Sequence, residues 1–190
     1  MPVLFGLIGK NIDYSFSKKY FTEKFELGQL SDYKYVNFDI QSIDEFPKIL
    51  NDNQDLKGLN VTIPYKESII QYLDKLSKTA FEIGAVNTIR FTKKGKLKGY
   101  NTDWFGFKES LEPLLQPHHK KALILGTGGA AKAVAYALGR LGILYTFVSR
   151  EAKENTIDYH FLNATTFDNY QIIINCTPLG THPNTKEFPP

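Results

Sequence analysis

The sequence contains little cysteine, little net charge and no long hydrophobic run. Cys176 is the only cysteine among 190 residues, which excludes an intramolecular disulfide and fits a reducing compartment. The net charge of +3 is too small to indicate a nucleic-acid or membrane-surface partner. No apolar run approaches the ~18 residues that a membrane helix needs, and the N-terminus shows no signal peptide. We therefore expect a soluble, cytoplasmic protein with no membrane or nucleic-acid partner.

Apolar residues are nevertheless frequent enough for folded cores. Hydrophobic residues make up 42% of the chain and aromatic residues 14%. The first half alternates apolar strands with amphipathic helices and then turns into a hairpin. The predicted strands are 3–9, 33–40 and 56–63, the predicted helices are 18–26, 42–51, 66–76 and 103–115, and the predicted hairpin joins 85–91 to 96–100. This order predicts an α/β domain.

A glycine-rich stretch organises the second half. Ala122–Leu125 predicts a short strand, and helix-forming residues begin at Ala130. Gly126, Gly128 and Ala131 follow the G-x-G-x-x-A spacing of dinucleotide-binding turns, in which backbone N–H groups and a helix dipole face a pyrophosphate. Because any glycine-rich turn between a strand and a helix matches this spacing, the motif alone is weak evidence.

We predict an N-terminal α/β substrate domain followed by a Rossmann-type dinucleotide-binding domain. Residues 1–103 form the substrate-binding catalytic domain, 104–120 a linking helix and hinge, and 121–190 the NADP-binding domain. Further strands are predicted at 144–149, 161–164 and 171–176. About six strands are usual in such a domain and only about four are predicted here, so we expect that the chain is truncated at its C-terminus.

Polar residues interrupt the first domain at loops and strand ends. Ser15 and Ser17 can both donate to one carboxylate, or they form the cap of the helix that follows. Asn60, Thr62 and Asn87 lie in apolar strands, where a polar side chain is costly without a partner. They are candidates either for internal hydrogen bonds or for ligand contacts.

Lys66 and Asp103 are the candidates for acid–base chemistry. Lys66 is predicted at the start of a helix, where the dipole disfavours a cation and favours loss of its proton. The alternative is an ordinary surface lysine. Asp103 either caps the helix that follows it or is the carboxylate partner of Lys66.

Arg150 directly follows the predicted strand 144–149, at the point where Rossmann-type domains bind a ribose. An arginine there favours the 2′-phosphate of NADP, and Lys153 can assist. Glu151 is a neighbour that can pair with Arg150 or repel a phosphate.

Cysteine and histidine carry less chemistry in this sequence. Cys176 has no local activating group, which favours a structural or merely accessible thiol over a nucleophile. His118 and His119 lie in the polar hinge, and no pattern of cysteine, histidine and carboxylate residues completes a metal site. We therefore expect no metal.

Segments spread along nearly the whole chain resemble motifs of the shikimate dehydrogenase family, and they occur in the family's order. The segments are Ser15–Ser17, Asn60–Lys66, Gly84–Thr88, Asn101–Asp103, Gly126–Ala131 and Asn175–Gly180. They resemble, in turn, a Ser-x-Ser clamp, Asn-Val-Thr-x-Pro-x-Lys, Gly-Ala-Val-Asn-Thr, Asn-Thr-Asp, a Gly-x-Gly-Gly-Ala loop and Asn-x-Thr-Pro-x-Gly. Each motif alone is a modest signal, whereas all of them in register are specific.

The resemblance implies an oxidoreductase that uses NADPH to reduce 3-dehydroshikimate reversibly to shikimate, in aromatic amino-acid biosynthesis. The implied catalytic pair is Lys66 and Asp103. The implied substrate-binding residues are Ser15 and Ser17 on the carboxylate and Thr62 and Asn87 on ring hydroxyls. The implied cofactor-binding residues are Gly126, Thr127, Gly128, Gly129, Ala130, Ser149, Arg150, Lys153 and Thr177.

The sequence also departs from the family pattern. Tyr14 and Lys18 stand where the family often has His and Pro, and Ser149–Glu151 replaces Asn-Arg-Thr. The family's C-terminal segment, with a substrate-binding glutamine and tyrosine, is expected to be missing. The alternatives are therefore an NAD-using quinate/shikimate dehydrogenase and a non-catalytic shikimate-binding module. The expected partners are small molecules, and the expected assembly is a monomer or a homodimer.

Overall fold

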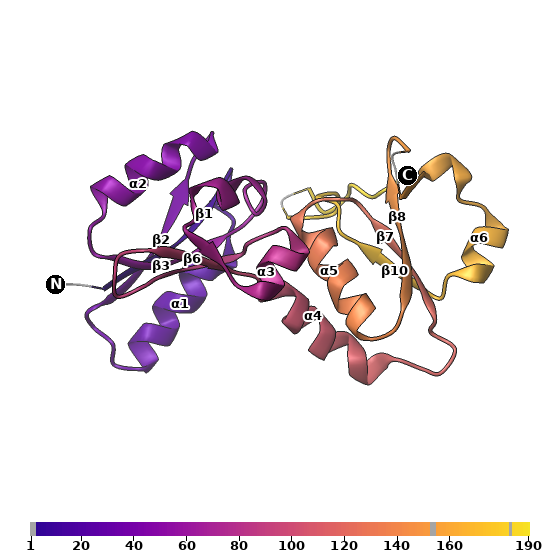
Figure 1. The fold of residues 1–190 in the computed structure, drawn as a ribbon, viewed down its shortest axis with the longest axis horizontal. Coiled ribbons are helices and arrows are strands. Elements are labelled where there is room, and N and C mark those ends of the chain that lie inside the picture. The colour runs from indigo at the N-terminus through magenta and orange to yellow at the C-terminus, as the bar shows by residue number, and fades with distance from the viewer. Residues whose placement is uncertain (1–2, 153–154, 183) are drawn as a thin grey trace. The chain divides into compact units, whose positions relative to one another are not determined.

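The computed structural model describes residues 3–152, 155–182 and 184–190 (Figure 1). The chain divides into two compact units, Met1–Asn101 and Thr102–Pro190, and the helix predicted to link the domains belongs to the second unit. Strands and helices alternate through both units, which confirms the predicted α/β fold class. Among the described residues, no helix is both long and apolar enough to cross a membrane.

The first unit is built around a mixed sheet. Its strands are β1 (Val3–Gly9), β2 (Tyr33–Asp39), β3 (Leu56–Val61), β4 (Lys75–Leu76), β5 (Thr88–Phe91) and β6 (Leu97–Tyr100), in the order β2-β1-β3-β5-β6-β4. Strand β1 is parallel to both of its neighbours, and β5 is antiparallel to both of its neighbours, so the predicted hairpin is confirmed. The helices are α1 (Phe16–Leu27), α2 (Phe46–Asp52) and α3 (Lys78–Ile83), with 3-10 turns η1 (Ile43–Glu45) and η2 (Ser68–Tyr72).

Side-chain alternation along β1 explains how this sheet is covered on both faces. Leu4 and Ile8 pack in the core cluster that contains Phe46 of α2. Leu7 packs in a second cluster, which Phe21 of α1 covers. Because alternate residues of a strand point to opposite sides, α1 and α2 lie on opposite faces of the sheet (Figure 1).

The helix predicted over 66–76 is wrong. The turn η2 and the short strand β4 occupy this stretch, and β4 pairs with β6. The amide of Leu97 donates to Asp74 Oδ2 at 2.8 Å, and the amide of Asp74 donates to the carbonyl of Leu97 at 3.1 Å. Ile69 and Leu73 still reach the core. The apolar pattern therefore marks burial correctly, but pairing with the sheet outweighs helix propensity.

Helix α3 is not predicted by the hydrophobic pattern. Ser77 begins it by accepting from the amide of Ala80 at 3.1 Å, and Gly84 ends it with a φ of 70°. Serine before a helix and glycine after it are recognised start and stop signals. The helix between them has only 6 residues, which is too short to show a helical period.

The second unit contains a parallel sheet. Its strands are β7 (Lys121–Leu125), β8 (Leu144–Ser149), β9 (Thr156–Asp158) and β10 (Ile172–Asn175), in the order β10-β7-β8-β9. Its helices are α4 (Asp103–Leu111), α5 (Gly129–Arg140) and α6 (Ala164–Asn169), with 3-10 turns η3 (Glu112–Leu114) and η4 (Tyr159–Phe161). Val134 and Leu138 of α5 pack on Ala122 and Ile124 of β7, and Phe107 of α4 covers the same cluster.

The strand predicted over 161–164 is also wrong, because η4 and α6 occupy it. Asn163 caps α6: its side chain accepts from the amide of Thr166 at 3.0 Å, and Thr166 Oγ1 accepts from the amide of Asn163 at 3.4 Å. This reciprocal capping box favours a helix start over a strand. Strand β9, just upstream, forms the edge of the sheet instead.

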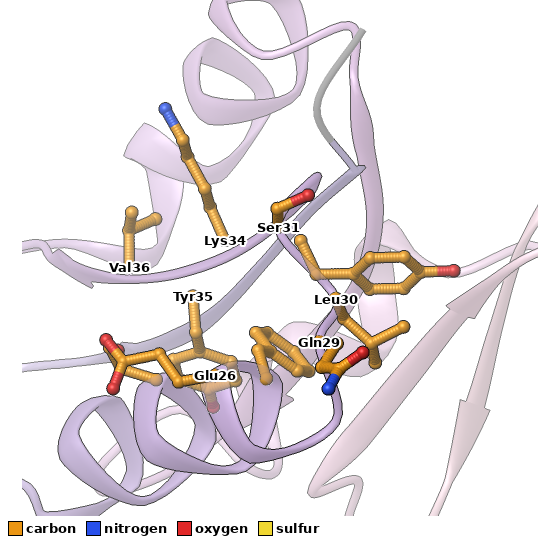
Figure 2. Close-up of a pocket in the computed structure, with 10 residues that line it drawn as sticks. Glu26, Gln29, Leu30, Ser31, Lys34, Tyr35 and Val36 are labelled. Carbon is orange, nitrogen blue, oxygen red and sulfur yellow. The ribbon is translucent and has the colours of Figure 1, made fainter.

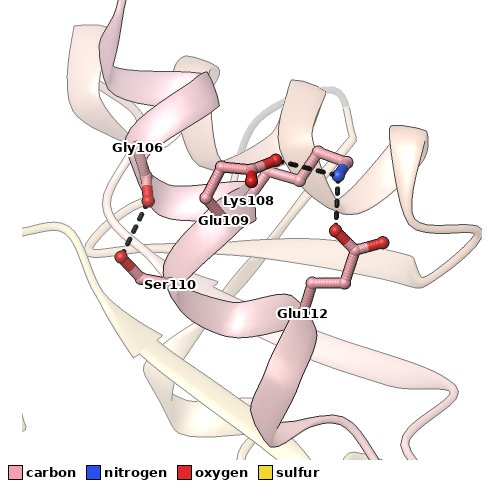
Figure 3. Close-up of polar contacts among 5 residues, drawn as sticks. All are labelled: Gly106, Lys108, Glu109, Ser110 and Glu112. Carbon is pink, nitrogen blue, oxygen red and sulfur yellow. Dashed lines mark hydrogen bonds and ion pairs between the residues drawn. The ribbon is translucent and has the colours of Figure 1, made fainter.

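The solvent-facing side of α4 carries local polar contacts (Figure 3). Lys108 Nζ lies 2.5 Å from Glu112 Oε2 and 3.3 Å from Glu109 Oε1, and Ser110 Oγ donates to the carbonyl of Gly106 at 2.8 Å. The hydrogen bond to Glu112 is the main reason that the pKa of Lys108 is raised. Such contacts along one exposed helix are typical of a solvated face.

Phe46→Ala is expected to lower the free energy of unfolding by about 3–5 kcal/mol, because the ring is 0% exposed and its removal leaves a cavity beside the sheet. Phe81→Ala is the matched control: this ring is 75% exposed, and its loss should cost less than ~0.5 kcal/mol. Urea unfolding followed by circular dichroism compares the two variants. Equal unfolding midpoints would contradict the assigned core.

Candidate functional site

Two loops of the first unit meet at the carboxyl ends of the parallel strands β1 and β3. The amide of Thr62 donates to the carbonyl of Ile8 at 2.9 Å, and the amide of Lys10 donates to the carbonyl of Ile63 at 3.1 Å. The two strand ends lie so close at Gly9 that an added Cβ atom there would be only 2.6 Å from Thr62 Cγ2. Sheets of this class hold ligands at the carboxyl ends of their strands, so these loops are the base of a candidate site.

The loop after β1 carries Ser15 and Ser17 at the start of α1. The Asp39 carboxylate fixes this loop by accepting from the amides of Asn11 and Ile12, both at 2.9 Å. Ser15 Oγ accepts from the amide of Ser17 at 3.2 Å and caps α1, which confirms the predicted cap. Capping uses a lone pair of the Ser15 hydroxyl, so it does not exclude donation of the hydroxyl hydrogen to a carboxylate.

Lys66 lies in the turn after β3 and not at the start of a helix, since η2 begins at Ser68. The helix-dipole argument for this lysine is therefore wrong, for the same reason that the 66–76 helix is absent. Its side chain is half-buried, and its carbonyl accepts from the amide of Val86 at 2.7 Å. That bond places the Lys66 turn beside the loop 84–87.

Asn87 and Asn101 are the buried polar residues of the described chain, at 9% and 4% exposure. The carbonyl of Asn87 accepts from the amide of Val61 at 2.8 Å, and its Oδ1 accepts from Thr88 Oγ1 at 3.1 Å. Asn101 Nδ2 donates to the carbonyl of Ala85 at 3.0 Å. Asn101 was not predicted as a site residue. Its contact supports the loop that presents Asn87.

Asp103 belongs to the second unit, where it is the first residue of α4 and is half-buried. Thr102, and not Asp103, occupies the N-cap position, so the predicted capping role is wrong. A carboxylate in the first turn is still favoured there, because it faces the positive end of the helix dipole.

The predicted strand, glycine turn and helix of the second unit are confirmed as β7, the turn 126–128 and α5. Gly126 has a φ of 106°, which L side chains rarely adopt, and an added Cβ would lie 3.1 Å from the carbonyl oxygen of Cys176. Gly128 is the N-cap of α5, and nothing lies within 4 Å of an added Cβ there. The predicted cofactor residues of this turn, none of them buried, are Gly126, Thr127, Gly128, Gly129 and Ala130. The backbone N–H groups of the first turn can therefore receive an anion.

Ser149 and Arg150 lie at the carboxyl end of β8. Arg150 is exposed, and its charge acts on Tyr159: burial raises the pKa of Tyr159, and Arg150 partly lowers it again. Ser149 is in register with Asp158 of β9, so a carboxylate that was not predicted as a site residue reaches the same end of the sheet. The predicted cofactor residue Lys153 lies outside the described residues.

Thr177 follows β10 in a loop that Asn175 holds. Asn175 Oδ1 accepts from the amide and the hydroxyl of Thr177 at 2.9 and 2.7 Å, and Asn175 Nδ2 donates to the carbonyl of Leu179 at 3.1 Å. The close approach of Cys176 to Gly126 places this loop beside the glycine turn. The Cys176 side chain packs against the core cluster under α5, which agrees with a structural thiol.

A groove of about 740 Å³ lies between the C-terminal half of α1 and the start of β2 (Figure 2). Its polar lining includes Thr22, Glu26 and Lys34. None of the predicted substrate-binding residues lines it. Among the described residues, no three His, Cys, Asp or Glu side chains are grouped as a metal ion would require.

Comparison with known proteins finds relatives along nearly the whole chain. A family model described as the shikimate dehydrogenase substrate binding domain matches residues 7–89. A curated relative from Clostridium botulinum, named shikimate dehydrogenase (NADP(+)), is 41% identical over 195 residues, covering 97% of this chain and 74% of that protein.

Solved structures agree with these sequence relatives. Shikimate dehydrogenase 1 from Peptoclostridium difficile superposes with a TM-score of 0.81 at 36% identity, over 97% of this chain and 69% of that chain. Shikimate 5-dehydrogenase from Thermus thermophilus, solved in complex with NADP(H) and shikimate, superposes with a TM-score of 0.80 at 28% identity, over 98% and 72%.

Gly126→Ala is expected to lower the free energy of unfolding by about 1–3 kcal/mol, because a side chain at its φ of 106° is strained. Gly139→Ala is the control in α5, where an added Cβ meets nothing within 4 Å and should stabilise by about 0.5–1 kcal/mol. Trp104, the only tryptophan, lies 5.2 Å from the ring of Tyr136 in α5, so its fluorescence reports on this unit. Urea unfolding followed by this fluorescence measures both variants. An unfolding midpoint for Gly126→Ala at or above that of Gly139→Ala would contradict the assigned turn.

Proposed function

The chain belongs to the shikimate dehydrogenase family, and we propose that it is an NADP-dependent oxidoreductase that interconverts 3-dehydroshikimate and shikimate. The observation that carries the proposal is the 41% identity, over 97% of this chain, to a relative named shikimate dehydrogenase (NADP(+)). We assign catalysis and substrate binding to residues 1–103, the linking helix and hinge to 104–120, and the cofactor to 121–190. The family match at 7–89 supports the first assignment. The proposal includes a cytoplasmic location, small-molecule partners, and a monomer or homodimer.

The proposed substrate site lies on the loops at the carboxyl ends of β1 and β3 and on the loop before β5. Ser15 and Ser17, on the loop that Asp39 fixes, donate to the carboxylate of the substrate. Thr62 and Asn87 bind ring hydroxyls. The backbone hydrogen bonds between these loops support this assignment. They hold the loops together within one unit, so the loops need little further ordering when the substrate binds.

Lys66 and Asp103 are the proposed catalytic pair. When bound, NADPH supplies a hydride to the carbonyl carbon of 3-dehydroshikimate. Lys66 gives a proton to the carbonyl oxygen and neutralises the negative charge that develops there. Asp103 orients the Lys66 ammonium and a substrate hydroxyl. In the reverse direction Lys66 accepts the hydroxyl proton of shikimate, and bound NADP⁺ would accept the hydride from the same carbon.

The cofactor residues are proposed on the three strand ends β7, β8 and β10. The positive φ of Gly126 and the open space at Gly128 fit a turn that a pyrophosphate approaches closely. Arg150, with Ser149 and Lys153, binds the 2′-phosphate. The remaining proposed contacts come from Thr127, Gly129, Ala130 and Thr177.

A second candidate is a quinate/shikimate dehydrogenase that uses NAD. Two carboxylates favour it: Glu151 adjoins Arg150, and Asp158 is in register with Ser149 at the end of the sheet. A carboxylate at this position binds a ribose hydroxyl and repels a phosphate. Initial rates with each pairing of shikimate or quinate with NADP⁺ or NAD⁺ decide between the two candidates.

Lys66→Ala is expected to lower kcat for shikimate oxidation by roughly 10²–10⁴-fold, because general acid–base catalysis typically contributes that much. The KM for NADP⁺ should stay unchanged. Lys57→Ala removes an exposed lysine of β3 and should keep wild-type rates. The measurement is the absorbance of NADPH formed in the steady state. Activity of Lys66→Ala near that of Lys57→Ala would rule out the proposed role.

Arg150→Gln is expected to raise the KM for NADP⁺ about tenfold or more and to leave the KM for NAD⁺ nearly unchanged, because a charge-assisted bond to the 2′-phosphate is lost. Arg140→Gln, at the exposed C-terminal end of α5, is the control. Steady-state titrations of each cofactor measure the effect. Equal changes for both cofactors would count against a 2′-phosphate contact.

A further inference from the structure

A row of hydrogen bonds runs through the first unit from β2 to the loop before β5. Tyr35 Oη donates to Asn60 Oδ1 at 2.8 Å. Asn60 Nδ2 donates to Thr88 Oγ1 at 3.5 Å, and Thr88 Oγ1 donates to Asn87 Oδ1 at 3.1 Å. The row therefore begins at a tyrosine to which the proposed function gives no role, and it ends at a proposed substrate residue.

Tyr35 is fixed in its place by packing. Its side chain is 6% exposed, and its ring stacks on Phe21 of α1 with centroids 4.5 Å apart and planes 14° apart. Figure 2 shows this side chain extending from β2 toward α1. Burial raises the pKa of Tyr35 well above its usual value, so its hydroxyl keeps the hydrogen that it donates to Asn60 Oδ1. The neighbouring Ser17 side chain lowers that pKa only in part.

The donor at Tyr35 sets the direction of every later bond. An asparagine amide can lie in two orientations that exchange its oxygen and nitrogen. Because Tyr35 donates, the Asn60 oxygen faces Tyr35 and the Asn60 nitrogen faces Thr88. The Thr88 hydroxyl then accepts from Asn60 and gives its hydrogen to Asn87 Oδ1. One orientation of the Asn87 amide is thereby selected.

We propose that Tyr35 is a positioning residue of the shikimate site, which fixes the orientation of the Asn87 amide through Asn60 and Thr88. This inference rests on the proposed function and extends it to a residue that does not itself contact the substrate. The row holds Asn87 in the orientation that binds a ring hydroxyl before substrate arrives, so less ordering is needed on binding.

A second buried tyrosine shows what a purely structural hydroxyl looks like in the same unit. Tyr65 is 5% exposed, and its hydroxyl donates to the backbone carbonyl of Ile40 at 2.8 Å. That bond ends on the main chain and leads to none of the proposed site residues. The Tyr35 bond instead ends on a side chain that continues toward Asn87.

Tyr35→Phe is the test, because it keeps the stacked ring and removes only the hydroxyl. Steady-state oxidation of shikimate should show a KM for shikimate raised about tenfold, as expected for a lost buried hydrogen bond, with kcat changed less than about threefold. The KM for NADP⁺ should not change. Tyr72→Phe is the matched control, since Tyr72 Oη donates to Asp44 Oδ1 at 2.9 Å, a contact unconnected with the row. It should keep the wild-type KM.

Thr88→Val provides a second, independent break of the same row. It should raise the KM for shikimate to a similar extent, and the double variant Tyr35→Phe/Thr88→Val should be no worse than Thr88→Val alone, because both changes interrupt one pathway. Calorimetric titration of shikimate into each variant reports the dissociation constant without turnover. Thermal unfolding checks that each variant is folded.

The outcomes separate this inference from the function on which it rests. A wild-type protein that oxidises shikimate, together with a Tyr35→Phe variant of unchanged KM and dissociation constant, overturns the inference alone. Independent, additive effects of the two substitutions also overturn it. A wild-type protein that neither binds nor oxidises shikimate overturns the proposed function and the inference together. A raised KM for shikimate in Tyr35→Phe, together with non-additive effects in the double variant, supports the proposed function and the inference.

Discussion

The parallel pairing of β1 with β3 determines where the proposed chemistry of the first unit can occur. It brings the loop that carries Ser15 and Ser17 against the loop that carries Thr62 and Lys66, with Gly9 small enough to permit the contact. The amide of Val86, bonded to the carbonyl of Lys66, then adds the loop that carries Asn87. Main-chain bonds thus gather residues from three distant parts of the chain at one edge of the sheet.

The second unit has the same arrangement of parallel strands, at the ends of which the cofactor is proposed to bind. Strands β7, β8 and β10 are parallel and end at one edge, so the glycine turn, the Arg150 loop and the Thr177 loop are neighbours by topology. The positive φ of Gly126 and its closeness to the carbonyl of Cys176 leave room for glycine and little else. This is the geometry that a dinucleotide phosphate requires at the start of a helix.

The sequence predicted the long, strongly patterned elements well and the short ones badly. Strand β1, the hairpin and helix α5 have clear periodicity and were found. The predictions for 66–76 and 161–164 are wrong. Pairing of β4 with β6 determines the structure of the first stretch, and the capping box of α6 determines the second. The hydrophobic pattern shows neither of these interactions. The sequence shows the residues of the proposed site, but it does not show the hydrogen bonds that hold these residues in place. Asn101 on the Ala85 carbonyl and Tyr35 on Asn60 depend on contacts between segments far apart in the chain.

Hydride transfer from shikimate to NADP⁺ is the step for which all the proposed residues are needed, and deuterium labelling follows that hydride. Shikimate carrying deuterium on the carbon whose hydroxyl is oxidised is incubated with the protein and NADP⁺, and the reduced cofactor is analysed by mass spectrometry and proton NMR. Direct hydride transfer yields NADPH that carries one deuterium at C4 of the nicotinamide, in the same amount as the 3-dehydroshikimate formed. NADPH without the label, or no NADPH at all, would contradict it.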